Sequence, residues 1–182
     1  ITEELLKLVS DWKGGFTGAF NIREDGGCAG RQSTEHIKIE PKQDLPGLDI
    51  HILPGTKGES VSIPACVTHG DVDDLVYNDF YVGAWADVTI VAGCGVHTEN
   101  GEPARHNGIH RFFLAKGSHV LYEEKHVGVG NSRRSACRRT YRTVVGDRRL
   151  PLRKRRRLDG PSFGAVRADR LGRGRRRGAL LA

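Results

Sequence analysis

Between Gly15 and Gly130 the sequence is built from short runs of apolar and β-branched residues, each closed by a turn residue. Runs of this length, bounded by Gly and Pro, predict strands joined by tight turns. Such a chain is typical of sandwiches, barrels and solenoids, and a helical bundle is disfavoured. The candidate strands are residues 16–22, 35–40, 48–53, 60–67, 75–82, 86–92, 109–115 and 119–126.

The glycine corners between these strands recur. The segment from Gly83 to Val88 resembles the one from Gly117 to Val120, with a glycine, a small residue and a β-branched residue in the same order. This recurrence is typical of a solenoid, in which each turn of chain stacks on the one before. A jelly roll produces a similar pattern of short strands and turns, so the residues alone leave both architectures open.

The first fourteen residues predict a helix. Thr2 is placed as an N-cap, with two acidic residues in the first turn, and the segment ends at Lys13-Gly14-Gly15. We expect this helix to pack on the strands that follow. The apolar residues near helical spacing are Leu5, Leu6, Leu8, Val9 and Trp12.

The net charge of +7 conceals two parts of opposite sign. Residues 1–130 hold 11 Lys and Arg against 19 Asp and Glu, a net charge of −8, whereas residues 131–182 hold 18 against 3, a net charge of +15. The second part has no sustained period of 2 or 3.6, and burial there cannot offset an ordering entropy of about 1–2 kcal/mol per residue. We therefore expect a helix at 1–14, a β core at 15–130 and a disordered arginine-rich tail at 131–182.

The composition also bears on cellular location. The sequence has no apolar stretch near the roughly 18–20 residues that a membrane span needs and no basic-then-apolar leader, which predicts a cytoplasmic protein. Its four cysteines lack CxxC spacing, so reduced thiols are expected rather than a disulfide framework or a zinc ribbon. The chain begins at Ile1 and contains no methionine, which indicates a fragment.

One thiol and three imidazoles fall within 17 residues, at Cys94, His97, His106 and His110. Thiolate and neutral imidazole are preferred ligands of iron, zinc and copper, and the glycines beside Cys94 could let a ligand approach its sulfur. His106 and His110 share strand parity, so both side chains can face the same way. The alternative is a buried cysteine at a corner and ordinary surface histidines.

Two other clusters carry weaker signals. The run Tyr122–His126 mixes acid, base and imidazole, which an exposed charged strand also explains. Asp71, Asp73 and Asp74 lack the spacing of a calcium loop and read better as a solvated turn. The basic tail could bind nucleic acid through phosphate neutralisation, but it has no recognisable motif, so nucleic acid binding is not expected.

Eight runs of the chain follow one known pattern: Arg31–Ile39, Asp49–Ile52, Gly55–Val61, Ile63–Pro64, Asp74–Gly83, Ala86–His97, His106–His110 and Tyr122–His126. Together they resemble the short SufB/SufD-like proteins of bacteria and archaea, which act as iron-sulfur cluster assembly scaffolds. The resemblance covers about residues 16–130 in chain order, and Asn107 departs from it, because the family has aspartate there.

This resemblance implies a right-handed parallel β-helix core that is not itself an enzyme. It implies a scaffold of the SUF system that works with the SufC ATPase, pairs with itself or a SufB/SufD paralogue, receives sulfur from a donor system and carries an iron-sulfur cluster transiently. Cys94 would receive sulfur or ligate iron, with His97, His106 and His110 as possible partners in cofactor binding and with Cys94, His106 and His110 as the metal ligands. Glu124, Lys125 and His126 are second-tier candidates.

The resemblance stops at Gly130, where the family continues with further β-helix rungs and a helical segment that docks SufC. We interpret residues 131–182 as the product of a reading-frame change. The competing hypotheses are a stand-alone, cupin-like metal-binding β-domain that uses Cys94, His97, His106 and His110, and a nucleic-acid binder that uses the tail.

Overall fold

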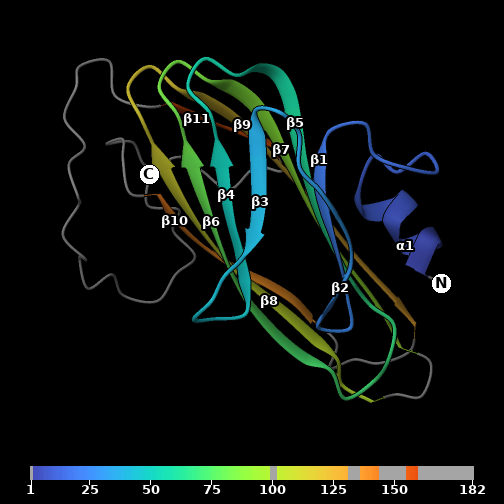
Figure 1. Ribbon diagram of the computed structural model, residues 1–182. Coiled ribbons are helices and arrows are strands. Elements are labelled where there is room, and N and C mark those ends of the chain that lie inside the picture. Colours follow the sequence, from blue (N-terminus) through green and yellow to red (C-terminus); the bar gives the residue numbers. More distant parts are fainter. Residues whose placement is uncertain (1, 99–101, 131–135, 144–154, 160–182) are drawn as a thin grey trace.

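The computed structural model describes residues 2–98, 102–130, 136–143 and 155–159. This part of the chain forms one short helix, α1 (Thr2–Val9), and eleven strands (Figure 1). The strands are β1 (Ala19–Glu24), β2 (Gly27–Gln32), β3 (Ile37–Pro41), β4 (Gly47–Ile52), β5 (Lys57–Val67), β6 (Asp73–Val82), β7 (Asp87–Thr98), β8 (Arg105–Leu114), β9 (His119–Gly130), β10 (Ala136–Thr143) and β11 (Arg155–Asp159).

The strands form two sheets. Sheet A has the order β11-β9-β7-β5-β1-β2, and sheet B has the order β10-β8-β6-β4-β3. From β4 to β10, successive strands alternate between the sheets, and each pairs in parallel with the strand two places along the chain. Antiparallel pairing joins β2 to β1, β3 to β4 and β11 to β9. The predicted mainly β fold with a short N-terminal helix is confirmed.

The core lies between the two sheets, where alternate side chains of every strand meet. Parallel pairing in register stacks similar side chains on neighbouring strands: Ile50 pairs with Phe80, which pairs with Phe112. The rings of Phe80 and Phe112 lie 4.8 Å apart and nearly parallel, and both are fully buried. This ladder forms the centre of the apolar part of the core.

The corners also stack. Gly117 lies against Trp85, and a Cβ at Gly117, where φ is +65°, would sit 2.3 Å from the Trp85 ring. The Trp85 amide donates a hydrogen bond to the Lys116 carbonyl, 2.9 Å away. The two glycine corners that look alike in the sequence are the connection from β6 to β7 and the connection from β8 to β9. In the fold they lie side by side.

Helix α1 lies on the outer face of sheet A (Figure 1). It is shorter than predicted because the chain leaves the helix at Ser10, whose amide and hydroxyl both donate to the Leu6 carbonyl. The hydroxyl of Thr2 donates to Glu24 on β1 rather than capping the helix. Leu8, counted in the apolar face, is 53% exposed, whereas Leu5, Leu6 and Val9 are buried.

The predicted strands are found, but their ends differ. β5, β7 and β8 extend beyond residues 60–67, 86–92 and 109–115, because parallel pairing continues through glycines that read as breaks in the sequence. β2 was not predicted at all, since its run of Gly, Cys, Ala and Gly has no strand-like apolar pattern and its side chains are mostly exposed.

Two strands, β10 and β11, fall within the segment that the sequence assigns to a disordered or frameshifted tail. The rest of residues 131–182 lies outside the described residues, so that assignment stays a prediction. Among the helices of the described chain, none is long and apolar enough to cross a membrane.

Candidate functional site

One part of the space between the sheets is polar rather than apolar. Alternation turns Asn21 and Arg23 of β1 inward from sheet A, and it turns Asp74 of β6 together with His106 and His110 of β8 inward from sheet B. Both histidines are only 2% exposed. Their predicted placement on one strand face is what brings them into this interior site, which we call the lumen site.

Asp74 organises the lumen site. Its two carboxylate oxygens accept hydrogen bonds from Nη2 and Nε of Arg23, at 2.6 and 2.7 Å. The same carboxylate lies 2.8 Å from Nδ1 of His106. Burial by itself would raise the pKa of Asp74, but the bonds from Arg23 and His106 outweigh it and bring the pKa to about 2.

These contacts fix the proton on His106. Since Asp74 is ionised at neutral pH, its oxygens can only accept, so Nδ1 of His106 is the donor. Arg23 already balances the charge of Asp74, which means that His106 need not be protonated to neutralise the buried carboxylate. A carboxylate that orients an imidazole in this way is also the arrangement found behind metal-binding histidines.

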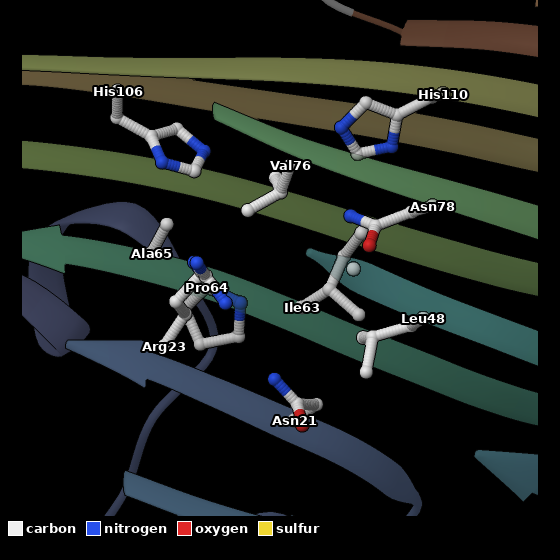
Figure 2. Close-up of a pocket in the computed structure, with 11 residues that line it drawn as sticks. Asn21, Arg23, Leu48, Ile63, Pro64, Ala65, Val76, Asn78, His106 and His110 are labelled. Atoms are coloured by element: carbon white, nitrogen blue, oxygen red, sulfur yellow. The ribbon is translucent and has the colours of Figure 1, made fainter. Parts of the chain in front are cut away.

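A cavity of about 20 Å³ lies at the centre of the lumen site, between the two histidines and β1. Figure 2 shows both imidazole rings turned toward it, with Val76 and Asn78 on the neighbouring strand and Asn21 opposite. The volume suits one water-sized group. His110 is packed further by Phe80, whose ring lies 5.9 Å away and nearly parallel.

Cys94 also faces inward, but it does not line this cavity. It is fully buried among Val67, Val96 and Ala104. Its sulfur is in a disulfide, whereas Cys28 and Cys66 are free thiols. The expectation of reduced cysteines is therefore wrong for Cys94, because disulfide pairing depends on which segments meet in the fold and not on CxxC spacing.

The glycines beside Cys94 serve helix packing rather than ligand access. They point to the outer face of sheet A, where α1 lies directly on them. A Cβ at Gly93 would sit 2.1 Å from the Val9 carbonyl oxygen, and one at Gly95 would sit 3.1 Å from the Leu5 side chain. The two glycines are therefore explained by the close approach of helix α1.

The remaining candidates divide between the two faces of β7 and β9. His126 pairs with Cys94 in the backbone register and has the same inward parity. Glu124 also has inward parity, and it accepts a 3.1 Å hydrogen bond from the Tyr122 hydroxyl. His97 has the opposite parity to Cys94 and lies on the outer face. Lys125 is also on the outer face, 2.7 Å from Asp11.

In the described part of the chain, no three His, Cys, Asp or Glu side chains come together as a metal-binding group. The assignment of Cys94, His106 and His110 as metal ligands therefore stays a prediction. Asp71, Asp73 and Asp74 do not act together, because Asp73 is exposed while Asp74 is 6% exposed and paired with Arg23.

Sequence reasoning missed Arg23, Asn21 and the role of Asp74. The only available signal was an arginine and an asparagine alternating with apolar residues in a strand, which usually marks a solvated face. No family model matches the chain, and no curated protein matches it.

Proposed function

We propose that this chain is a scaffold component of the SUF iron-sulfur cluster assembly system, folded as a right-handed parallel β-helix and working in the cytoplasm with a SufC-type ATPase. The observation that carries the proposal is the strand order. Seven successive strands, β4 to β10, step between two sheets and pair in parallel with the strand two places along. That path is the one a two-sheet solenoid follows, and from β4 to β9 it lies within the residues of the family resemblance.

The second support is chemical. The inward faces of β7 and β8 hold a buried cysteine and two buried histidines, Cys94, His106 and His110, whereas His126 on β9 shares the parity of Cys94 but is exposed. Thiolate and imidazole are the ligand types that iron takes. Cys94 is proposed to accept sulfur or bind iron once its disulfide is reduced, with His106 and His110 as imidazole ligands. His97 is left out of this set because it faces outward.

A full cluster is larger than the cavity of about 20 Å³ between the histidines. We therefore propose Cys94 on β7 as the attachment point of the cargo and the oriented imidazoles of the lumen site as its imidazole ligands. The Asp74–His106 bond supports this role, since it holds Nδ1 as the protonated nitrogen of the ring. Self-pairing or pairing with a paralogue would be needed to supply further ligands.

The cupin-like alternative has less support. Its jelly roll is antiparallel, whereas the central strands here pair in parallel, and its ligand set would include the outward-facing His97. Nucleic-acid binding would depend on the arginine-rich tail, most of which lies outside the described residues.

The test is anaerobic reconstitution of the reduced full chain with ferrous iron and sulfide. The wild type should develop visible sulfide-to-iron absorption. Cys94→Ala should lose most of it, while Cys28→Ala, which removes an exposed thiol on β2, should keep it. A wild type without such absorption, or equal spectra for the two variants, would count against the scaffold. Binding of zinc alone, with no response to sulfide, would favour the cupin-like alternative.

A further inference from the structure

A second site lies on the outer face of sheet A, away from the lumen. The chain between α1 and β1 passes over β5, β7 and β9 and leaves a groove of about 570 Å³, within the usual size range of small-molecule sites. We call it the loop groove. Six loop residues line it: Asp11, Lys13, Gly15, Phe16, Thr17 and Gly18. The sheet contributes the outward side chains of Ser60, Ser62, Thr89, Val91, Leu121 and Glu123.

The floor of the loop groove carries three hydroxyl groups, those of Ser60, Ser62 and Thr89. Ser60 pairs with Thr89 in the register, and Ser62 lies two residues further along β5. Ser62 is only 7% exposed. Within the described chain, none of these three hydroxyls makes a hydrogen bond, so a nearly buried donor faces the groove without a protein acceptor. The Ser62 oxygen is not among the fully enclosed side-chain atoms without a partner in the described chain, so water can reach it and a polar group of a bound ligand can take the place of that water.

The loop that covers the groove has the composition of an anion-binding loop. It runs Lys13-Gly14-Gly15-Phe16-Thr17-Gly18, with φ of +89° at Gly14. Glycines let backbone amides approach an anion closely. Gly18 already packs against β5, where a Cβ would lie 2.7 Å from the Ser60 carbonyl oxygen. The ammonium of Lys13 lines the groove, and no described carboxylate lies within ion-pairing distance of it.

Two carboxylates also line the loop groove. Asp11 is neutralised by Lys125, 2.7 Å away. Glu123 lies on β9, which is two strands, or about 10 Å, from the serines of β5. The groove therefore has a basic, amide-rich cover, a hydroxyl-bearing floor and an acidic far side, with Phe16 as an apolar wall.

We propose that the loop groove binds a small phosphorylated molecule that carries hydroxyl groups, of the sugar-phosphate or nucleoside-phosphate class. Its phosphate lies at Lys13 and the glycine-rich loop, and its hydroxyl groups lie on Ser60, Ser62 and Thr89. This site is independent of the lumen site and of the cluster-assembly role.

Calorimetric titration of the full chain tests the proposal. The probes are ribose 5-phosphate and AMP, with ribose and adenosine as the matched controls without phosphate. We expect one of the phosphorylated probes to bind and its unphosphorylated partner to bind at least about tenfold more weakly, as loss of one charge-assisted hydrogen bond predicts. Lys13→Gln and Ser62→Ala should each weaken binding by about tenfold. Lys38→Gln, an exposed lysine on sheet B, should leave binding unchanged.

Both test substitutions are mild, and a thermal melt of each variant confirms that it folds. Inorganic phosphate should compete with the bound probe. The proposal is wrong if neither phosphorylated probe binds at millimolar concentration, if phosphate makes no difference to affinity, or if the folded Lys13 and Ser62 variants bind as well as the wild type.

Discussion

Asp74 shows how one residue can hold two sheets together. Its partner Arg23 is 51 positions earlier in the chain and belongs to the other sheet, while His106 is a lateral neighbour within sheet B. The carboxylate is 6% exposed, so its charge is stable only because both partners are present. The contact therefore couples folding of the N-terminal strand to the geometry of the lumen site.

The depressed pKa of Asp74 predicts a pH dependence. A carboxyl that titrates at about 2 in the folded state and at 3.8 when unfolded contributes about 2 kcal/mol of stability at neutral pH. That stability is present above the unfolded pKa and is lost as pH falls from about 4 to 2. Denaturant unfolding of the wild type should show this loss. Asp74→Asn should be less stable at pH 7 and should lack it.

Asp73→Asn is the control for this experiment, since Asp73 is an exposed neighbour on the same strand. It should follow the wild-type pH profile. Parallel profiles for the wild type and Asp74→Asn between pH 4 and 2 would mean that the Arg23 and His106 bonds do not form in solution.

Sequence could place the two lumen histidines on one strand face but could not find Arg23 or its bond. Parity is a local property, readable from spacing of four residues, whereas the Arg23–Asp74 pair depends on how two sheets are brought together. The same limit explains Cys94. Its flanking glycines were visible, yet only the position of α1 reveals what they accommodate.

Helix α1 packs closely on β7 because two residues of that strand, Gly93 and Gly95, have no side chain. The helix buries Leu5, Leu6 and Val9, with Leu5 and Val9 directly against the two glycines of β7, and Leu5 and Leu6 form a small cluster with Ile22 and Cys66 beneath it. Burial raises the pKa of the Cys66 thiol to about 12, so it is a packing residue and not a nucleophile. The helix is thus attached by close backbone approach and a modest apolar patch.

Gly93→Ala should separate this helix from the sheet. The added methyl group would lie 2.1 Å from the Val9 carbonyl oxygen, which a backbone cannot accommodate without moving. We expect a loss of about 1–3 kcal/mol in unfolding free energy and faster hydrogen exchange of the α1 amides.

Gly128→Ala is the matched control, because a Cβ there would meet nothing within 4 Å. It should change stability by no more than about 0.5 kcal/mol. Equal exchange rates for the α1 amides in the Gly93 variant and the wild type would show that the helix does not rest on β7.

Across the whole molecule, parallel register turns similar residues into ladders on both faces of sheet B. Inside lie Ile50, Phe80 and Phe112; outside, one residue further along each strand, lie His51, Tyr81 and Phe113. The outer rings are also stacked, 4.7 and 4.8 Å apart, but they face solvent. The two ladders have nearly the same ring stacking but differ in burial. Substitutions in each ladder therefore show which face of sheet B belongs to the core.

Phe112→Ala should cost about 3–5 kcal/mol of unfolding free energy, the range for a buried phenylalanine. Phe113→Ala, its immediate neighbour, should cost about 1 kcal/mol because its ring is partly hydrated in the folded state. Chemical denaturation of both variants measures the difference. Equal losses, or a larger loss at Phe113, would place the core on the wrong face of sheet B.

The mainly β architecture could be predicted from the sequence, because turn residues and the lengths of the apolar runs indicate short strands joined by tight turns. The pairing was less accessible: a recurrence of glycine corners left a solenoid and a jelly roll open, and only the register between β5, β7 and β9 shows which strands meet. β2 was invisible, since an exposed edge strand needs no apolar residues.

We propose that the inward faces of β7 and β8 carry the cluster chemistry. It is tested most directly by iron content and visible absorption of the reconstituted, reduced chain in two variants, His110→Ala on the inward face of β8 and His97→Ala on the outer face of β7. We expect His97→Ala to keep wild-type iron and absorption, whereas His110→Ala should lose at least half of both. Equal loss in the two variants, or loss only in His97→Ala, would contradict it.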